Sequence, residues 1–154
     1  MTDSLFSFSL PDESTTAALA GQIAPYLAPG DALLLEGEIG AGKSAFARAL
    51  IRARLGRMED VPSPTFTIVQ TYEDETGDIW HCDLYRLTHP DEALELGLDE
   101  AFETAICLIE WPDRLGDETP DSALTLSFVA KDRDHHVTIT GPALWQDRLA
   151  GLHV

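Results

Sequence analysis

The octapeptide GEIGAGKS, residues 37–44, constrains the fold of this chain more than any other stretch. It matches G-x-x-x-x-G-K-[ST], a pattern in which a glycine-rich loop turns backbone N–H groups toward phosphate oxygens. The apolar run ALLLE at residues 32–36 leads directly into the loop, and a helical stretch leads out of it from Lys43 to Leu55 and stops at Gly56. The pattern therefore predicts a buried strand, a phosphate-binding loop and a helix, in that order.

The remaining segments predict a sheet with both parallel and antiparallel strands. A helix is expected within residues 11–27, with Ser14 or Thr15 as its cap and an early end near Pro25. Runs of β-branched and apolar residues predict strands at residues 6–10, 65–72, 79–87, 105–111, 123–130 and 135–141. Further helices are expected at residues 89–102 and 143–152. The sequence thus predicts an α/β fold, namely a three-layer P-loop NTPase-like domain with a mixed central sheet, spanning residues 1–154 as a single domain.

The residue types of the glycine-rich loop suit a nucleoside triphosphate with its metal ion. Lys43 is expected to reach the β and γ phosphates, and the hydroxyl of Ser44 is expected to contact Mg²⁺. The candidate nucleotide-binding residues of the loop are Gly37, Gly40, Ala41, Gly42, Lys43, Ser44 and Ala45. Lys43 and Ser44 are therefore the first candidates for a catalytic and a metal-binding role.

Two carboxylates are candidates for the acid that Mg²⁺ usually requires in addition to its waters. Glu110 ends the apolar run ICLIE, where an acid of the Walker-B type is placed, and Asp83 lies in HCDLYR within an expected strand. An acid in the middle of a strand needs a reason to be there; the alternative for each residue is a solvent-exposed acid at a strand end or on an edge strand. Glu110 and Asp83 are both predicted as catalytic and metal-binding residues, and the spacing leaves open which one orients the attacking water.

Several other side chains have a functional and a structural interpretation. Trp111 follows Glu110 and either stacks near the nucleotide or packs in the core. Arg133 and Arg86 are possible contacts for phosphate or base, with ordinary surface arginines as the alternative. The segment 63–67 is either a switch that senses the γ phosphate or a proline-stiffened connection. His81, His135 and His136 form no metal-binding set with a nearby cysteine or acid, so we interpret them as structural or solvated.

Charge and composition narrow the class of function. The formal net charge is −17, and positive charge clusters only at Arg48, Arg52, Arg54 and Arg57, so a direct grip on a nucleic-acid backbone is not expected. The chain has no asparagine and hence no N-K-x-D guanine-binding motif, which favours ATP over GTP. ATP hydrolysis coupled to a partner is the simplest interpretation. A nucleotide-dependent binding module and a small-molecule kinase remain as alternatives, the latter weakened by the scarcity of arginines after Arg57.

The sequence also bears on the cellular compartment of the protein. No apolar run approaches the length of a membrane span, and the N-terminus lacks the basic start of a signal peptide. Cys82 and Cys107 show no metal-binding or disulfide spacing and fit two buried, reduced thiols. We therefore expect a cytoplasmic protein without a membrane partner.

Five segments in this order and spacing resemble the TsaE (YjeE) family of bacterial ATPases. They are GEIGAGKS, VPSPTFTIVQTY, HCDLYRL, ELGLDEAF and LIEWPDRL, and the resemblance covers the chain from about Leu10 to Arg114. Where this chain has Ser44, threonine is common in the family, and both residues supply a hydroxyl.

The resemblance implies a role in the synthesis of threonylcarbamoyladenosine (t6A) in tRNA, as an ATPase that supports turnover of a TsaB–TsaD complex. The partner complex, rather than this chain, would contact the tRNA. The resemblance also implies ATP and Mg²⁺ as cofactors, Ser44, Glu110 and Asp83 as the functional set, and Trp111 beside the nucleotide. Glu13 and Thr15 match an early acidic-plus-hydroxyl stretch of the family and are candidates for nucleotide contact.

Overall fold

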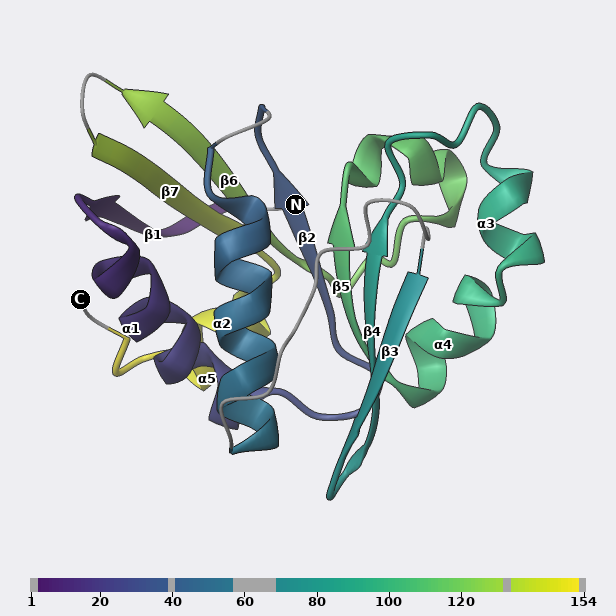
Figure 1. Ribbon diagram of the computed structural model, residues 1–154, viewed down its shortest axis with the longest axis horizontal. Helices are drawn as coiled ribbons and strands as arrows, with labels where there is room; N and C mark the ends of the chain where they lie inside the picture. The colour runs from purple at the N-terminus through teal and green to yellow at the C-terminus, as the bar shows by residue number, and fades with distance from the viewer. Residues whose placement is uncertain (1–2, 39–40, 57–68, 132–133, 153–154) are drawn as a thin grey trace.

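A mixed β-sheet enclosed by two layers of helices forms the protein (Figure 1). The computed structural model describes residues 3–38, 41–56, 69–131 and 134–152. The strands are β1 (Asp3–Leu10), β2 (Ala32–Glu36), β3 (Val69–Asp74), β4 (Gly77–Asp83), β5 (Ile106–Glu110), β6 (Leu124–Lys131) and β7 (Asp134–Gly141). The helices are α1 (Glu13–Ile23), η1 (Ala24–Tyr26), α2 (Lys43–Leu55), α3 (Asp91–Glu95), α4 (Leu98–Thr104), η2 (Pro112–Glu118) and α5 (Ala143–Arg148). The predicted three-layer α/β fold with a mixed sheet is confirmed.

The order of the strands brings the ends of three parallel strands together. Within the described residues, seven strands form one sheet in the order β1-β7-β6-β2-β5-β4-β3. Strand β2 pairs in parallel with β5 and β6, and β5 pairs in parallel with β4. Leu35 and Asp83 are the register partners of Glu110 on its two sides. Since ligands of open α/β sheets bind outside the carboxyl ends of the strands, this register defines the edge where a site is expected.

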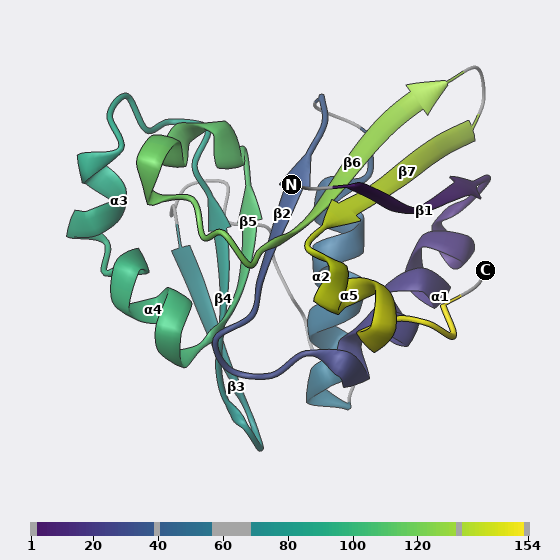
Figure 2. The same ribbon diagram turned by 180° about the vertical axis from the view of Figure 1, so that it is seen from behind.

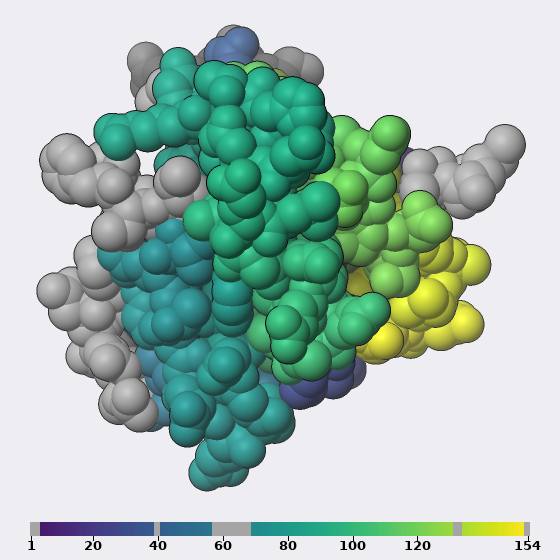
Figure 3. All heavy atoms as spheres, turned by 90° about the vertical axis from the view of Figure 1, so that its right-hand side faces the viewer, coloured from purple at the N-terminus to yellow at the C-terminus, as the bar shows by residue number. Residues whose placement is uncertain are grey.

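Alternation of side chains along the central strands divides the core between the two helical layers. Leu33 and Leu35 of β2 pack in the cluster that includes residues of α1 and α2, whereas Ala32 and Leu34 pack with residues of α4. Figures 1 and 2 show α1, α2 and α5 on one side of the sheet and α3 and α4 on the other. In Figure 3 the teal and green part of the chain, which includes α3 and α4, covers the face of that second layer. Both faces of β2 and β5 are therefore buried, as their continuous apolar sequences predict.

The first helix confirms the predicted early end but corrects the predicted cap. Asp12, rather than Ser14 or Thr15, is the N-cap, because its side chain accepts a hydrogen bond of 2.8 Å from the backbone N–H of Thr15. Helix α1 ends at Ile23 and continues as the short 3₁₀ helix η1, which contains Pro25. Proline lacks the N–H that would continue the α-helical ladder.

The expected helix over residues 89–102 is divided into α3 and α4 at Gly97, whose φ is 86°. This left-handed conformation, which glycine tolerates, ends one helix and begins the next. Leu94 lies in the first of the two helices and is 39% exposed, whereas Leu98 at the start of the second is buried.

The predicted strand over residues 79–87 is too long. Strand β4 ends at Asp83, and the backbone N–H of Leu84 turns to the carbonyl oxygen of Glu110 at 3.1 Å. Asp83 therefore lies at a strand end rather than in mid-strand. Cys82 and Cys107 are free and buried as predicted, and burial raises the pKa of Cys107 to about 12. Among the described residues, no helix is long and apolar enough to cross a membrane.

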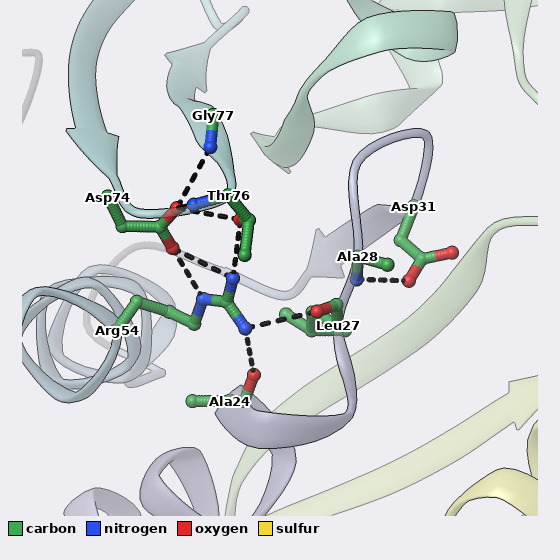
Figure 4. Close-up of polar contacts among 8 residues, drawn as sticks. All are labelled: Ala24, Leu27, Ala28, Asp31, Arg54, Asp74, Thr76 and Gly77. Carbon is green, nitrogen blue, oxygen red and sulfur yellow. Dashed lines mark hydrogen bonds and ion pairs between the residues drawn. The ribbon is translucent and has the colours of Figure 1, made fainter.

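Arg54 joins the last turn of α2 to the β3–β4 hairpin and to the end of the first helix (Figure 4). Its Nε donates to Asp74 Oδ2 at 2.8 Å, and its Nη1 donates to the carbonyl oxygens of Ala24 and Leu27, each at 3.0 Å. Burial alone would raise the pKa of Asp74, but hydrogen bonds from Thr76 and Arg54 hold it below its ordinary value. The side chains of Arg54 and Asp74 are largely buried, at 10% and 6% exposure. Removing either one would leave the other as a buried charge without its partner.

We predict that Arg54→Met lowers the free energy of unfolding by about 3 kcal/mol, because it leaves Asp74 without its buried cation and removes the donor from Asp74 Oδ2 and from two carbonyl oxygens. Urea unfolding of the variant and the unmodified protein measures the difference. Arg48→Met, on the same helix, is the matched control, since Arg48 makes no hydrogen bond or ion pair within the described residues. Equal losses in the two variants would contradict the role assigned to Arg54.

Candidate functional site

The glycine-rich loop approaches the neighbouring strand β6 too closely for any side chain at its first position. Gly37 has a φ of 141°, and a Cβ atom there would lie 2.5 Å from the carbonyl oxygen of Phe128. Gly42 has a φ of 109° and is the N-cap of α2. Ala41, which lies between these two glycines in the sequence, is buried, and Gly40 lies outside the described residues. The loop therefore needs glycine at both described positions to bring the N-terminus of α2 beside the ends of β2 and β6.

Lys43 is folded back onto the loop. Its side chain is 5% exposed, its Nζ donates a hydrogen bond to the carbonyl oxygen of Gly37, and Nζ lies 3.8 Å from the centroid of the Trp111 ring. Burial lowers the pKa of Lys43, while the charges of nearby carboxylates, Glu110 foremost, oppose that shift. The ammonium group is thus held at the start of α2 by one carbonyl oxygen, one aromatic face and the field of these acids.

Ser44, Glu110 and His81 form a continuous chain of polar contacts. Ser44 Oγ donates to Glu110, lying 3.0 Å from Oε1 and 3.3 Å from Oε2. His81 Nε2 lies 2.7 Å from Glu110 Oε2. Glu110 is only 3% exposed. A buried carboxylate without hydrogen-bond partners would destabilise the fold, so the contacts with Ser44 and His81 explain how this acid can lie buried at the end of β5. The structure therefore brings together two of the three predicted metal-binding residues, Ser44 and Glu110.

Asp83 lies beside this chain without joining it. It is the register partner of Glu110 on β4, and its Oδ1 accepts a hydrogen bond of 3.1 Å from the backbone N–H of Tyr85. Its charge is among those that act on Lys43. Asp83 is half-buried, so its carboxylate is more open to solvent than that of Glu110.

Trp111 covers Lys43 and contacts a second aromatic ring. Its ring centroid lies 4.9 Å from that of Tyr85, which is 51% exposed. The backbone of Trp111 has a φ of 58°, a left-handed conformation that costs a non-glycine residue about 1 kcal/mol. This strained residue turns the chain from β5 into η2 directly beside the loop.

Within the described residues, no side-chain hydrogen bond or ion pair joins the remaining candidates to the glycine-rich loop. Glu13 is exposed in the first turn of α1, and Thr15 is bonded to Asp12 through its backbone N–H and its hydroxyl. Ala45 is half-buried in the first turn of α2, and Arg86 is exposed. Arg133 and the segment 63–67 lie outside the described residues. The nucleotide contacts of these residues stay predictions.

His81 is a site residue that the sequence alone does not identify. The sequence favours a structural or solvated histidine, but the side chain is completely buried against Glu110. One signal does exist: His81 and Asp83 are two residues apart on a strand and therefore point to the same face of the sheet. The sequence alone does not show that this strand pairs with β5, and it is that pairing which brings His81 to Glu110.

The described residues hold no cluster of three or more His, Cys, Asp or Glu side chains of the kind that binds a metal ion by itself. A hydroxyl oxygen beside a single carboxylate suits Mg²⁺, which keeps several waters and takes further oxygens from phosphate. A cavity of about 360 Å³ adjoins the loop and is lined by Gly37, Glu38, Ala41, Phe128, Val129 and Ala130. A partly apolar hollow therefore lies directly beside the glycine-rich loop.

Comparisons with a family model, with related sequences and with a solved structure agree with one another. The family model described as "Threonylcarbamoyl adenosine biosynthesis protein TsaE" matches residues 10–138. A "tRNA threonylcarbamoyladenosine biosynthesis protein TsaE" of Rickettsia felis is 43% identical over 104 residues, and the match spans 68% of this chain but only 61% of that protein. The protein of the same name from Bacillus subtilis is 39% identical over 132 residues, 84% of this chain and 80% of the relative. The crystal structure of Bacillus subtilis YdiB is similar, with a TM-score of 0.80 and 30% identity, over 97% of this chain and 93% of that chain.

We predict that Gly37→Ala destabilises the protein by roughly 1–3 kcal/mol, because the new Cβ meets the Phe128 carbonyl oxygen in a backbone conformation that alanine disfavours. Gly21→Ala is the matched control. Gly21 lies within α1, and an added methyl group there would meet no atom within 4 Å, so this variant should gain about 0.5–1 kcal/mol. Urea unfolding measures both changes, and a Gly37→Ala variant as stable as Gly21→Ala would contradict the close approach.

Proposed function

Since this chain belongs to the TsaE family, we propose that it binds ATP with Mg²⁺ and hydrolyses it in support of t6A synthesis in tRNA. The observation that carries this proposal is the contact between the Ser44 hydroxyl and the Glu110 carboxylate. It places the last residue of the glycine-rich pattern, at the start of α2, against an acid at the end of a parallel strand. That is the donor set of an Mg²⁺–nucleotide site in P-loop proteins.

The described residues fit the roles that such a site requires. Ser44 and Glu110 would hold Mg²⁺ together with phosphate oxygens and water, as two hard oxygen donors that already lie 3.0 Å apart. When bound, the ion would neutralise negative charge on the β and γ phosphates. Lys43 would exchange the carbonyl oxygen of Gly37 for a phosphate oxygen, and the N-terminus of α2 would add partial positive charge. These terms explain how a chain of net charge −17 could bind a triphosphate.

The two carboxylates suit different tasks. Glu110 is buried and held by Ser44 and His81, which fits a metal ligand of fixed orientation. Asp83 is half-buried at the end of the adjacent strand, which fits a residue that accepts a proton from, or orients, the attacking water. We therefore assign the water-orienting role to Asp83.

The proposed partner is a TsaB–TsaD complex, and contact with tRNA would be indirect. The net negative charge of the chain disfavours direct binding to the tRNA backbone, because such binding requires clustered basic side chains. The coupling is tested by measuring Mg²⁺-dependent ATP hydrolysis with and without TsaB and TsaD. Activity that rises on adding the partners supports the proposal, and an unchanged rate contradicts the coupling.

A second candidate function is a nucleotide-gated binding module, favoured by the contacts of Lys43. Its ammonium group lies over Trp111, and Trp111 contacts the exposed ring of Tyr85. Movement of Lys43 to a phosphate would remove the cation from the Trp111 face and alter this surface. In that case binding alone, rather than hydrolysis, would carry the signal to a partner.

We predict that Lys43→Ala reduces ATP affinity at least 10-fold, because the phosphate charge loses its only ammonium partner in the loop. Glu110→Gln should leave nucleotide binding in the absence of Mg²⁺ unchanged but abolish most of its Mg²⁺ dependence. Isothermal titration with a non-hydrolysable ATP analogue, with Mg²⁺ and with EDTA, measures both effects. Wild-type affinity in both variants would contradict the proposed site.

We predict that Asp83→Asn binds ATP with Mg²⁺ normally but loses at least 100-fold in hydrolysis rate, because the amide cannot accept the proton of the attacking water. The same variant separates the two candidate functions. If it fails to support repeated turnover of t6A formation by TsaB and TsaD, hydrolysis is required. Full support by a variant that does not hydrolyse ATP would favour the binding module.

A further inference from the structure

His81 is a completely buried ionisable side chain that contacts the proposed metal ligand Glu110 without being a proposed ligand itself. Its relative exposure is 0%, and its Nε2 lies 2.7 Å from Glu110 Oε2. Among the described residues, its other ring nitrogen, Nδ1, has no hydrogen-bond partner. An apolar side chain would fill the same space without burying an unpaired nitrogen, so the contact with Glu110, rather than packing, accounts for a histidine here.

The chemistry of the pair defines which nitrogen carries the proton. An ionised carboxylate only accepts hydrogen bonds, so Nε2 must be the donor. Nδ1 is the ring nitrogen that has no hydrogen-bond partner among the described residues. The opposite tautomer would place two acceptors 2.7 Å apart and bury an N–H group without a partner, which is the more costly arrangement.

The two partners of Glu110 divide its carboxylate between them. Ser44 Oγ lies closer to Oε1, at 3.0 Å, than to Oε2, at 3.3 Å. The shorter bond from His81, at 2.7 Å, is made to Oε2. His81 therefore restrains one oxygen and leaves the other directed toward the hydroxyl at the start of α2.

We propose that His81 is a positioning residue that orients the Glu110 carboxylate for Mg²⁺, an inference that rests on the proposed function. A residue that holds a metal ligand in this way acts through the ligand, and its loss typically lowers metal affinity by roughly 10–100-fold. His81 comes from β4 and Glu110 from β5, so the orientation depends on the parallel pairing of these strands.

Two amide substitutions distinguish positioning from packing. The amide nitrogen of glutamine corresponds in reach to Nε2 of histidine, whereas that of asparagine corresponds to Nδ1. His81→Gln can therefore still donate to Glu110, and His81→Asn cannot. His89→Asn is the control, because the His89 side chain is 66% exposed.

The experiment measures the Mg²⁺ concentration that half-saturates binding of a non-hydrolysable ATP analogue, with binding in EDTA as the reference. We expect His81→Asn to raise this concentration about 10-fold or more, and His81→Gln to stay within about 3-fold of the unmodified protein. Binding in EDTA should be the same in all variants, since the glycine-rich loop is not altered. Circular dichroism establishes that each variant is folded.

The possible outcomes separate this inference from the proposed function. If the unmodified protein binds no nucleotide with Mg²⁺, the proposed function is wrong. If it does and His81→Asn has the same Mg²⁺ dependence, or Gln and Asn weaken it equally, the positioning role is wrong. If His81→Asn does not fold, long-range ¹H–¹⁵N correlation spectra of the unmodified protein decide the matter: a protonated Nε2 supports the role, and a ring protonated only at Nδ1 overturns it.

Discussion

Parallel pairing of β2, β5 and β4 is the constraint on which the candidate site depends. Leu35 and Asp83 lie opposite Glu110, so three strands end at one edge of the sheet. The loop after β2 turns at this edge, and α2 begins there with Lys43 and Ser44. A shift of one residue in the register of β5 would turn Glu110 toward the α3–α4 layer and away from Ser44. The sheet therefore positions the polar groups, and the loop adds the glycines that let α2 start so close.

Helix α2 is held to the sheet by polar contacts at both ends. At its start, Ser44 donates to Glu110 of β5. At its end, Arg54 bonds Asp74 at the turn of the β3–β4 hairpin and two carbonyl oxygens after α1 (Figure 4). The same hairpin carries His81 and Asp83 toward the site through β4. Two directional polar contacts thus tie the start of the helix to β5 and its end to the β3–β4 hairpin, in addition to the apolar packing of its buried face.

Part of the fold follows from local sequence. The order of strand, loop and helix at residues 32–56 is predicted with correct boundaries, because a buried run, a glycine pattern and a terminal glycine act over short distances. Element ends governed by competition between neighbours are predicted less well. Asp12 displaces the expected caps, Gly97 divides a helix, and β4 ends at Asp83. In each case one side chain or one backbone turn outweighs a pattern of several residues.

The sequence by itself determined where the glycines, the ammonium group and the hydroxyl of the loop stand, and it predicted an acid at a strand end to accompany Ser44. Glycine conformations, the single loop ammonium group and a hydroxyl at the helix start are properties of neighbouring residues, so they can be read locally. Only the tertiary structure decided that Glu110 makes the contact with Ser44, that Asp83 stands beside it, and that His81 holds it. These assignments depend on strand order and register, which are set by the packing of segments that lie about thirty to seventy residues apart in the chain.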